Sequence, residues 1–201
     1  MDDPLQSAFV SRGGLKLQHA LATFDLSVHN LRCADFGANV GGFTDCLLKS
    51  GASHVTAVDT GYGTLAWTLR KDPRVRVMER SNALHAAPPA GEPFDLIAID
   101  MGWTPQRLCI PAALKWLRPT GRIITLIKPH YETTDAEKQL LVSGVLPEPV
   151  AERITARVLE AMPSLGARVL ASTPSPIIGG KTKKNTAGNH EWLALLAPSA
   201  T

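Results

Sequence analysis

The sequence predicts an α/β fold, with a mostly parallel seven-stranded sheet, helices on both faces and an antiparallel last strand. The first observation is that short apolar runs alternate with segments of helical periodicity along most of the 201 residues, which is typical of a parallel sheet. The second is that a loop, and no helix, joins the last two apolar runs, which favours an antiparallel strand at one edge. A single domain over 1–201 is expected, because a chain of this length can bury its own core.

Each expected strand is a short run of apolar and β-branched residues. The strands are expected at 31–37, 54–59, 74–79, 94–100, 121–128, 167–172 and 191–197. Helical spacing of apolar residues predicts helices at 14–24, 41–51, 63–71, 105–119 and 148–162. The second helix is expected to close at Gly51 and the fourth to break near Pro111, because proline lacks the N–H that a helix needs. Turn-forming residues predict loops at 86–93, 130–146 and 173–189.

Composition excludes several classes of protein. Hydrophobic residues make up 44% of the chain and charged residues 19%, so we expect it to fold and not to stay disordered. No apolar run approaches the roughly 18 residues of a membrane span, and the start "MDDPLQSAFV" lacks the layout of a signal peptide. We therefore expect a cytoplasmic protein without a membrane partner. Cys33, Cys46 and Cys109 are widely spaced, which favours reduced thiols over disulfides or a metal site.

A glycine-rich turn, "ADFGANVGGF", separates the first strand from the helix that follows it. Gly37, Gly41 and Gly42 have a G-x-x-x-G-G spacing, which differs from the G-x-G-x-x-G fingerprint of dinucleotide-binding proteins. Such a turn lets a ligand lie against bare backbone, although a purely structural tight turn is the alternative. Asp59 ends the second strand about 20 residues later, where a carboxylate typically accepts hydrogen bonds from ribose hydroxyls. The two features together predict a cofactor site.

Larger blocks of the sequence resemble one family of enzymes. The blocks are "SRGGLKL", "DFGANVGGFTDCLLKSGA", "AVDTGYGTLAWTLRKDPRVRVMERSN", "LIKPHYE" and "GNHEWLALL". Together they resemble the FtsJ/RrmJ-like RNA 2′-O-methyltransferases and, within that family, the TlyA branch. The resemblance implies a Rossmann-like class I methyltransferase fold, S-adenosylmethionine as methyl donor, and 2′-O-methylation of ribose in RNA, with ribosomal RNA as the expected substrate. It places the cofactor on Asp35, Gly37, Ala38, Asn39, Gly41, Gly42, Phe43, Asp59, Asn82 and Asp100.

The resemblance also implies a catalytic tetrad of Lys16, Asp100, Lys128 and Glu191. Asp100 and Lys128 each end a buried strand, so both are expected at the carboxyl rim of the sheet. Burial and a second ammonium favour Lys128 as a general base, whereas a neighbouring carboxylate favours a charged lysine that orients the hydroxyl. The sequence leaves this choice open. It also leaves open that Lys16 is a solvated helix residue and that Glu191 is an exposed residue of an edge strand.

The chain departs from the TlyA pattern at three places. One is the insertion "GGKTKKNTAG" before Glu191, which is longer than the usual loop of the family and is expected to be an RNA-binding lid or a solvated loop. TlyA-like proteins usually carry a small RNA-binding domain before the "SRGGLKL" block, and here only ten residues precede Ser11. We therefore expect RNA contacts from Arg12, from the basic stretch 70–80 and from the lysines of 181–184, with a partner protein or a homodimer supplying further affinity. The segment "DMGWTPQR" is also unusual for the branch. We expect Trp103 in the core, and stacking on a base is the alternative.

Other functions are weighed against this one. A donor-binding RNA module that is inactive without a partner stays open, as does the haemolysin label that TlyA relatives have carried. A dehydrogenase is disfavoured by the glycine spacing. Amino-group methylation of a base is disfavoured because "DMGW" stands where those enzymes resemble one another in an Asp/Asn-Pro-Pro-aromatic motif. Cytosine C5 methylation needs a cysteine nucleophile, and Cys109 is expected to be buried and inert.

Overall fold

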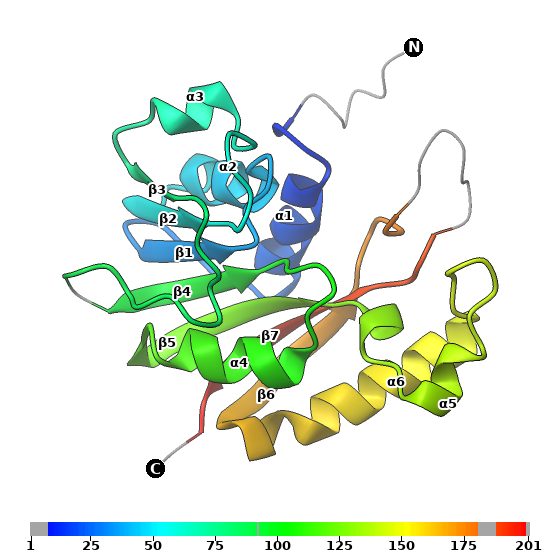
Figure 1. Ribbon diagram of the computed structural model, residues 1–201. Coiled ribbons are helices and arrows are strands. Elements are labelled where there is room, and N and C mark those ends of the chain that lie inside the picture. The colour runs from blue at the N-terminus through cyan, green and yellow to red at the C-terminus, as the bar shows by residue number, and fades with distance from the viewer. Residues whose placement is uncertain (1–7, 92, 181–187, 200–201) are drawn as a thin grey trace.

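The computed structural model describes residues 8–91, 93–180 and 188–199. They form one seven-stranded sheet in the order β3-β2-β1-β4-β5-β7-β6 (Figure 1). The strands are β1 (Arg32–Phe36), β2 (His54–Val58), β3 (Val75–Met78), β4 (Phe94–Ile99), β5 (Leu117–Ile127), β6 (Ala167–Pro174) and β7 (Trp192–Pro198). The first five strands run parallel, and β7 pairs antiparallel with both β5 and β6. The predicted fold class is confirmed.

The last strand lies inside the sheet, so the expected edge position of β7 is wrong. Five consecutive residues of β7 are buried, which requires cover on both faces of the sheet and a strand on each side. In β6, residues that are exposed alternate with residues that are more buried, as is usual for a strand at the edge of a sheet. The hairpin from β6 to β7 therefore inserts its second strand next to β5, and it brings the residues just before β7 close to the end of β5.

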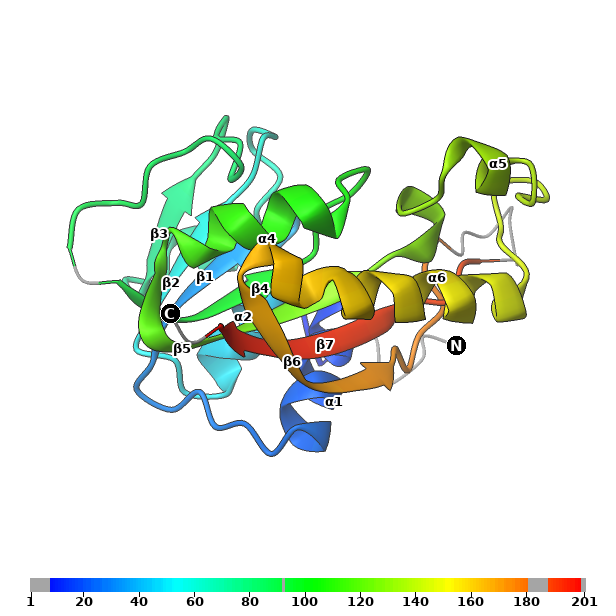
Figure 2. The same ribbon diagram turned by 90° about the horizontal axis from the view of Figure 1, so that it is seen from below.

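Helices cover both faces of the sheet, as the alternation of strands and helices predicts. They are α1 (Gly13–Thr23), α2 (Gly42–Lys49), α3 (Trp67–Arg70), α4 (Gln106–Leu114), α5 (Asp135–Lys138) and α6 (Glu148–Ala161), with short 3-10 turns at Pro129–Tyr131 and Met162–Leu165. Figure 2 shows α4 and α6 on one face and α1 and α2 on the other. Each face has its own apolar core, and successive residues of β4 point alternately into one or the other.

Two helices are shorter than predicted. The fourth helix continues through Pro111 and ends at Leu114, and β5 then begins at Leu117. Trp116 explains the early end: its ring stacks on Phe94 and meets Phe36 edge-on, and its carbonyl accepts the N–H of Phe94 at 2.9 Å, which draws the chain back into the sheet. Only Trp67–Arg70 of the third predicted helix is helical, because the turn before it is held by hydrogen bonds from the N–H groups of Gly61 and Gly63 to carboxylates.

The three cysteines are free and buried, as predicted. Burial raises the pKa of each thiol to about 12, so Cys109 is protonated at neutral pH and is a poor nucleophile. Among the described residues, every helix is too short or too polar to span a bilayer.

Candidate active site

The carboxyl ends of β1, β2, β4 and β5 border a cavity of about 630 Å³. Ligands of parallel α/β sheets bind at this edge, which agrees with the predicted position of the site. The cavity is lined by the glycine-rich turn, by the residues that follow β2, β3 and β4, by Lys128, and by the segment 177–180 that leads into the β6–β7 hairpin. Backbone of the glycine-rich turn and both polar and apolar side chains therefore line the cavity.

The glycine-rich turn has the close backbone approach that the sequence predicts. Gly37 has a φ of +87°, and a Cβ at this position would lie 2.6 Å from the carbonyl oxygen of Asp100. Gly41 has a φ of +103°, and a Cβ there would collide with the side chains of Leu65 and Leu69. Both positions thus require glycine for conformation and for space. The turn packs directly against the end of β4 and leaves room for a ligand above it.

Asp59 holds the edge of the cavity by two short hydrogen bonds. Its Oδ2 accepts the N–H of Asn39 at 2.8 Å, and its Oδ1 accepts the N–H of Gly61 at 2.7 Å. Each carboxylate oxygen can accept two hydrogen bonds, so both keep acceptor capacity toward the cavity that Asp59 lines. The residues present therefore fit a ribose diol, and a 2′-phosphate is disfavoured by the charge of Asp59.

Most of the residues predicted to bind the cofactor line this cavity, namely Gly37, Ala38, Asn39, Gly42, Phe43, Asp59, Asn82 and Asp100. Asp35 and Gly41 do not. Asp35 is fully buried beneath the turn, where its Oδ2 accepts the N–H and the hydroxyl of Thr44 at 2.9 and 2.7 Å. Asp35 therefore does not line the cavity in this structure, and its carboxylate fixes the start of α2.

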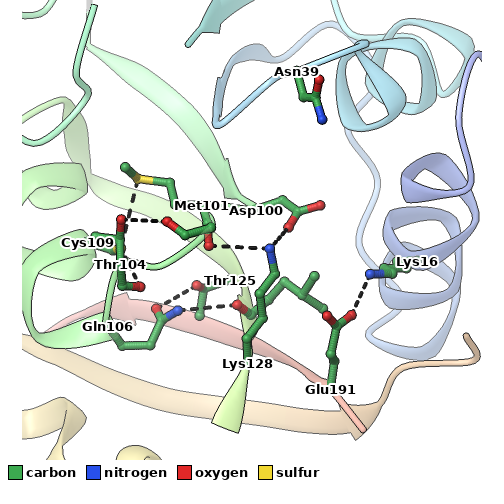
Figure 3. Close-up of polar contacts among 12 residues, drawn as sticks. Lys16, Asn39, Asp100, Met101, Thr104, Gln106, Cys109, Thr125, Lys128 and Glu191 are labelled. Atoms are coloured by element: carbon green, nitrogen blue, oxygen red, sulfur yellow. Dashed lines mark hydrogen bonds and ion pairs between the residues drawn. The ribbon is translucent and has the colours of Figure 1, made fainter. Parts of the chain in front are cut away.

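The four predicted catalytic residues meet as two ion pairs at the cavity (Figure 3). Lys16 Nζ lies 2.5 Å from Glu191 Oε2, and Lys128 Nζ lies 2.5 Å from Asp100 Oδ1. Lys128 Nζ also donates to the carbonyl oxygen of Met101 at 3.3 Å. The pairs join α1, the residue before β7 and the ends of β4 and β5, so residues far apart in the chain form one site.

The two open alternatives for Lys16 and Glu191 are wrong. Their side chains are 11% and 4% exposed, so Lys16 is not a solvated lysine and Glu191 is not an exposed edge residue. A Cβ at Gly179 would collide with the carboxylate of Glu191, which shows how closely the hairpin backbone covers this group. Glu191 itself does not line the cavity, but it contacts Lys16, which does.

The charge of Lys128 follows from its neighbours. Burial lowers its pKa, but the charge and hydrogen bond of Asp100 raise it, as do Glu191 and Tyr131, and the net shift is upward from 10.5. Lys128 is therefore an ammonium at neutral pH, which favours the orienting role over that of a general base. Burial lowers the pKa of His130 to about 4, with help from Lys128 and Lys16, so that imidazole is neutral.

The structure adds residues that the sequence analysis did not place at the cavity, namely Tyr131, Ile177 and Ile178. Trp103 is 85% exposed, lines the cavity, and has its ring centroid 5.9 Å from that of Tyr131. The expected core position of Trp103 is therefore wrong. Its φ of 52° turns the chain away from the sheet, a conformation that no sequence pattern at "DMGW" predicts.

Fold and cavity together define a class I methyltransferase that uses S-adenosylmethionine. The model of the FtsJ-like methyltransferase family matches residues 9–184, and the chain belongs to that family. It is 39% identical over 193 residues to the 16S/23S rRNA (cytidine-2'-O)-methyltransferase TlyA of Mycobacterium tuberculosis, covering 95% of this chain and 69% of TlyA. It is 35% identical over 189 residues to Hemolysin A of Brachyspira hyodysenteriae, covering 92% of this chain and 75% of that protein.

Solved structures agree with this family. A "Putative hemolysin from Streptococcus thermophilus" superposes with a TM-score of 0.84 at 36% identity, covering 100% of this chain and 70% of that chain. An N-methyltransferase from Burkholderia thailandensis, solved with S-adenosylhomocysteine, has a TM-score of 0.60 at 18% identity, covering 97% and 80% of the two chains. The second likeness supports the fold alone. The resemblance seen in the sequence is thus confirmed.

Proposed function

We propose that this enzyme transfers the methyl group of S-adenosylmethionine to the 2′-hydroxyl of a ribose in ribosomal RNA. The observation that carries the proposal is the pair of partly buried lysine–carboxylate contacts, Lys16–Glu191 and Lys128–Asp100, at one cavity. The TlyA relative acts on cytidines of 16S and 23S rRNA, so a cytidine is the first target to test. A ribosomal substrate also supports the proposal that the enzyme works in the cytoplasm.

The cavity supports a bound donor in one orientation. The backbone of 37–42 and the carboxylate of Asp59 would hold its nucleoside, and Asn82 lies on the same side of the cavity wall. Asp100 also lines the cavity, next to Lys128. When bound, S-adenosylmethionine supplies a methyl group that its sulfonium makes electrophilic. The protein then has to bring one ribose oxygen to that methyl group and to exclude water.

Lys128 is suited to orient the ribose hydroxyl. An ammonium has three donors; one faces Asp100 and one the carbonyl of Met101, so one remains for the 2′-oxygen. This hydrogen bond directs an oxygen lone pair toward the methyl group, and orientation of this kind contributes most of the rate when the electrophile is already reactive. As the O–C bond forms, the bond between the methyl carbon and the donor's sulfur breaks, which leaves S-adenosylhomocysteine. The hydroxyl proton leaves in the same step, and Asp100 is the adjacent carboxylate that can accept it.

Lys16 and Glu191 have a role in the site that differs from that of Lys128. Lys16 lines the cavity and offers a second cation to the RNA backbone or to the ribose. Glu191 fixes the direction of that ammonium, because the two atoms are 2.5 Å apart in a buried setting. Arg12 lies in the same wall, one turn of α1 before Lys16, and adds a further cation for a phosphate.

Exposed aromatic side chains next to the basic stretch 70–80 support RNA contacts by stacking. In the basic stretch 70–80, Arg70 pairs with Glu79 and Arg74 with Asp72, so these arginines are engaged within the protein. Tyr62 and Trp67 are 70% and 67% exposed, and each has a cation over its ring, Arg80 at 4.2 Å and Lys71 at 4.9 Å. Exposed aromatic rings next to cations are suited to stack on bases and bind phosphates.

Further affinity for RNA is proposed to come from a partner protein or a second copy of the chain. The lysines of 181–184 lie outside the described residues. If the domain only binds donor and RNA until a partner arrives, the purified protein will bind the donor and methylate RNA only after cell extract is added. A lytic activity, suggested by the names of the hemolysin relatives, predicts that the pure protein leaks dye from liposomes.

Nucleoside mass spectrometry of ribosomal RNA from cells with and without the gene tests the proposal. The expected result is one or more 2′-O-methylnucleosides that disappear in the deletion strain and return when the wild-type gene is restored. Restoration with Lys128→Ala is the control, and it should not return the modification. Loss of a base-methylated nucleoside in the deletion strain would reject ribose methylation.

A further inference from the structure

Beyond the two ion pairs, the core beneath the site holds a buried amide. Gln106 is the first residue of α4, and its side chain reaches toward β5 (Figure 3). Its Nε2 donates to the carbonyl oxygen of Leu126 at 3.3 Å, and its Oε1 accepts the hydroxyl of Thr125 at 2.7 Å. Gln106 and Thr125 are both buried. Burial of an amide costs free energy unless the amide is hydrogen-bonded. These two hydrogen bonds therefore tie the start of α4 to the end of β5.

The main chain of Gln106 makes a second link to the same region. Its N–H donates to Glu132 Oε1 at 2.7 Å, which satisfies a free N–H at the start of α4. Glu132 directly follows the turn Pro129–Tyr131, and its own carbonyl accepts a hydrogen bond from Arg157 of α6 at 2.8 Å. Gln106 thus holds the end of β5 by its side chain and the segment after Lys128 by its backbone.

The two linked segments are those that carry the reactive groups. The loop 100–105, which directly precedes Gln106, contains Asp100, Met101 and Trp103. The segment 128–132, which begins at the end of β5, contains Lys128 and Tyr131. Contacts at the cavity cross between the same two segments: Lys128 to Asp100, Lys128 to Met101, and Trp103 to Tyr131. A small shift of α4 against β5 would change all three.

We infer that Gln106 and Thr125 are positioning residues for methyl transfer, because their hydrogen bond sets the loop 100–105 against Lys128. The inference rests on the proposed function for the reaction itself. It does not make either residue catalytic, since neither lines the cavity. A purely structural pair would lower the stability of the fold when broken, without a selective effect on the orientation of Lys128 or Trp103.

Substitutions at Thr125 separate the two roles. Thr125→Val keeps the shape and removes the hydroxyl, whereas Thr125→Ser keeps the hydroxyl. Thr155→Val is the matched control, because Thr155 is also a buried threonine, bonded to the carbonyl of Ala151 at 2.9 Å within α6. We expect Thr125→Val to lower kcat about tenfold, with donor affinity within twofold, and Thr125→Ser to restore it. Thr155→Val should lower the melting temperature alone.

A second readout does not depend on turnover. The indole N–H signal of Trp103 in a proton–nitrogen NMR spectrum reports the loop 100–105 directly. We expect this signal to shift or broaden in Thr125→Val and to stay in place in Thr125→Ser and Thr155→Val. The double variant Gln106→Leu/Thr125→Val removes both partners and should regain stability while kcat stays low.

Two outcomes would overturn the inference. One is an unchanged Trp103 signal in Thr125→Val; the other is a kcat that recovers together with stability in the double variant. If the wild-type protein methylates no RNA, the proposed function fails, and the Trp103 signal still decides whether Thr125 positions the loop.

Discussion

Lys16 and Glu191 form an ion pair of 2.5 Å although 175 positions separate them in the chain. Lys16 lies on α1 and is partly buried, and Glu191 lies immediately before β7 and is buried. The pair therefore joins the two ends of the domain at the cavity. It exists because β7 inserts between β5 and β6, which places the residue before β7 opposite α1.

Breaking this pair should destabilise the protein and slow methyl transfer. Glu191→Gln keeps the shape but leaves the ammonium of Lys16 buried without its carboxylate, which costs about 3 kcal/mol in comparable pairs. We expect methyl transfer to fall about a hundredfold with donor affinity nearly unchanged, because Glu191 does not line the cavity. Urea unfolding and calorimetry with the donor measure both effects. Glu148→Gln, at an exposed acid near His190, is the control and should change neither quantity.

Removal of the Lys128 ammonium should abolish transfer without loss of the donor. Lys128→Ala deletes the donor that orients the ribose oxygen, so kcat should fall at least about a thousandfold, while the affinity for S-adenosylmethionine changes little. Single-turnover assays with donor-saturated enzyme and calorimetry check the two parts. A variant that still transfers methyl groups at a tenth of the wild-type rate would contradict the orienting role.

The pH dependence of the reaction distinguishes an orienting lysine from a basic one. The pKa of Lys128 is raised above 10.5 in the folded protein, so its ammonium and the stability that it contributes are present at neutral pH and are lost only as pH rises through the higher value. We expect the single-turnover rate to show no rise between about pH 7 and 9 that depends on Lys128. A rising limb there that Lys128→Arg removes would show instead that a neutral lysine acts as the base.

Asp35 should make stability fall as pH rises. Burial, together with Asp100 and Asp59, raises its pKa from 3.8 to about 7 against the opposing hydrogen bonds of Thr44. Between pH 3.8 and about 7 the folded state therefore binds more protons than the unfolded state. The contribution of Asp35 to the free energy of unfolding is full below pH 3.8 and is lost as pH rises through about 7. Asp35→Asn should flatten this slope in urea unfolding measured between pH 4 and 8. Parallel curves for the two proteins would show that Asp35 does not titrate there.

The exposed aromatic rings should contribute to RNA affinity and not to donor affinity. Tyr62→Ala and Trp67→Ala each remove a stacking surface, and we expect each to weaken RNA binding about tenfold. Tyr62→Phe and Trp67→Phe keep a ring and should keep most of the affinity. Filter binding of ribosomal RNA fragments at fixed salt measures the change. Equal RNA affinity for wild type and the alanine variants would place the RNA elsewhere.

The sequence predicts where the strands and helices lie along the chain better than it predicts which of them lie side by side in the fold. The apolar runs locate all of the strands, and the glycine-rich turn and Asp59 locate the cavity, because these signals are local. The place of β7 between β5 and β6 is not predicted, since an apolar run buried on both faces fits any interior position of a sheet. The end of α4 is missed because Trp116, which ends it, acts through contacts with Phe36 and Phe94 that lie far away in sequence.

The candidate site divides in the same way. Lys16, Asp100, Lys128 and Glu191 were identified through resemblance, and no spacing in the chain would pair Lys16 with Glu191. The position of Asp35 is not predicted, because a carboxylate at the end of a strand can point above the sheet to a ligand or below the turn to Thr44, as it does here. The charge of Lys128 cannot be predicted from the sequence, because it depends on the contact with Asp100 that only the fold brings about.

The central claim is that the two ion pairs serve the alkylation of a ribose oxygen. Its most direct test is methyl transfer from isotopically labelled S-adenosylmethionine to ribosomal RNA by the purified protein, followed by digestion and mass spectrometry of nucleosides. The account predicts label on a 2′-O-methylribose with the wild-type protein and none with Lys128→Ala. Label on a base, or equal ribose labelling by Lys128→Ala, would contradict it.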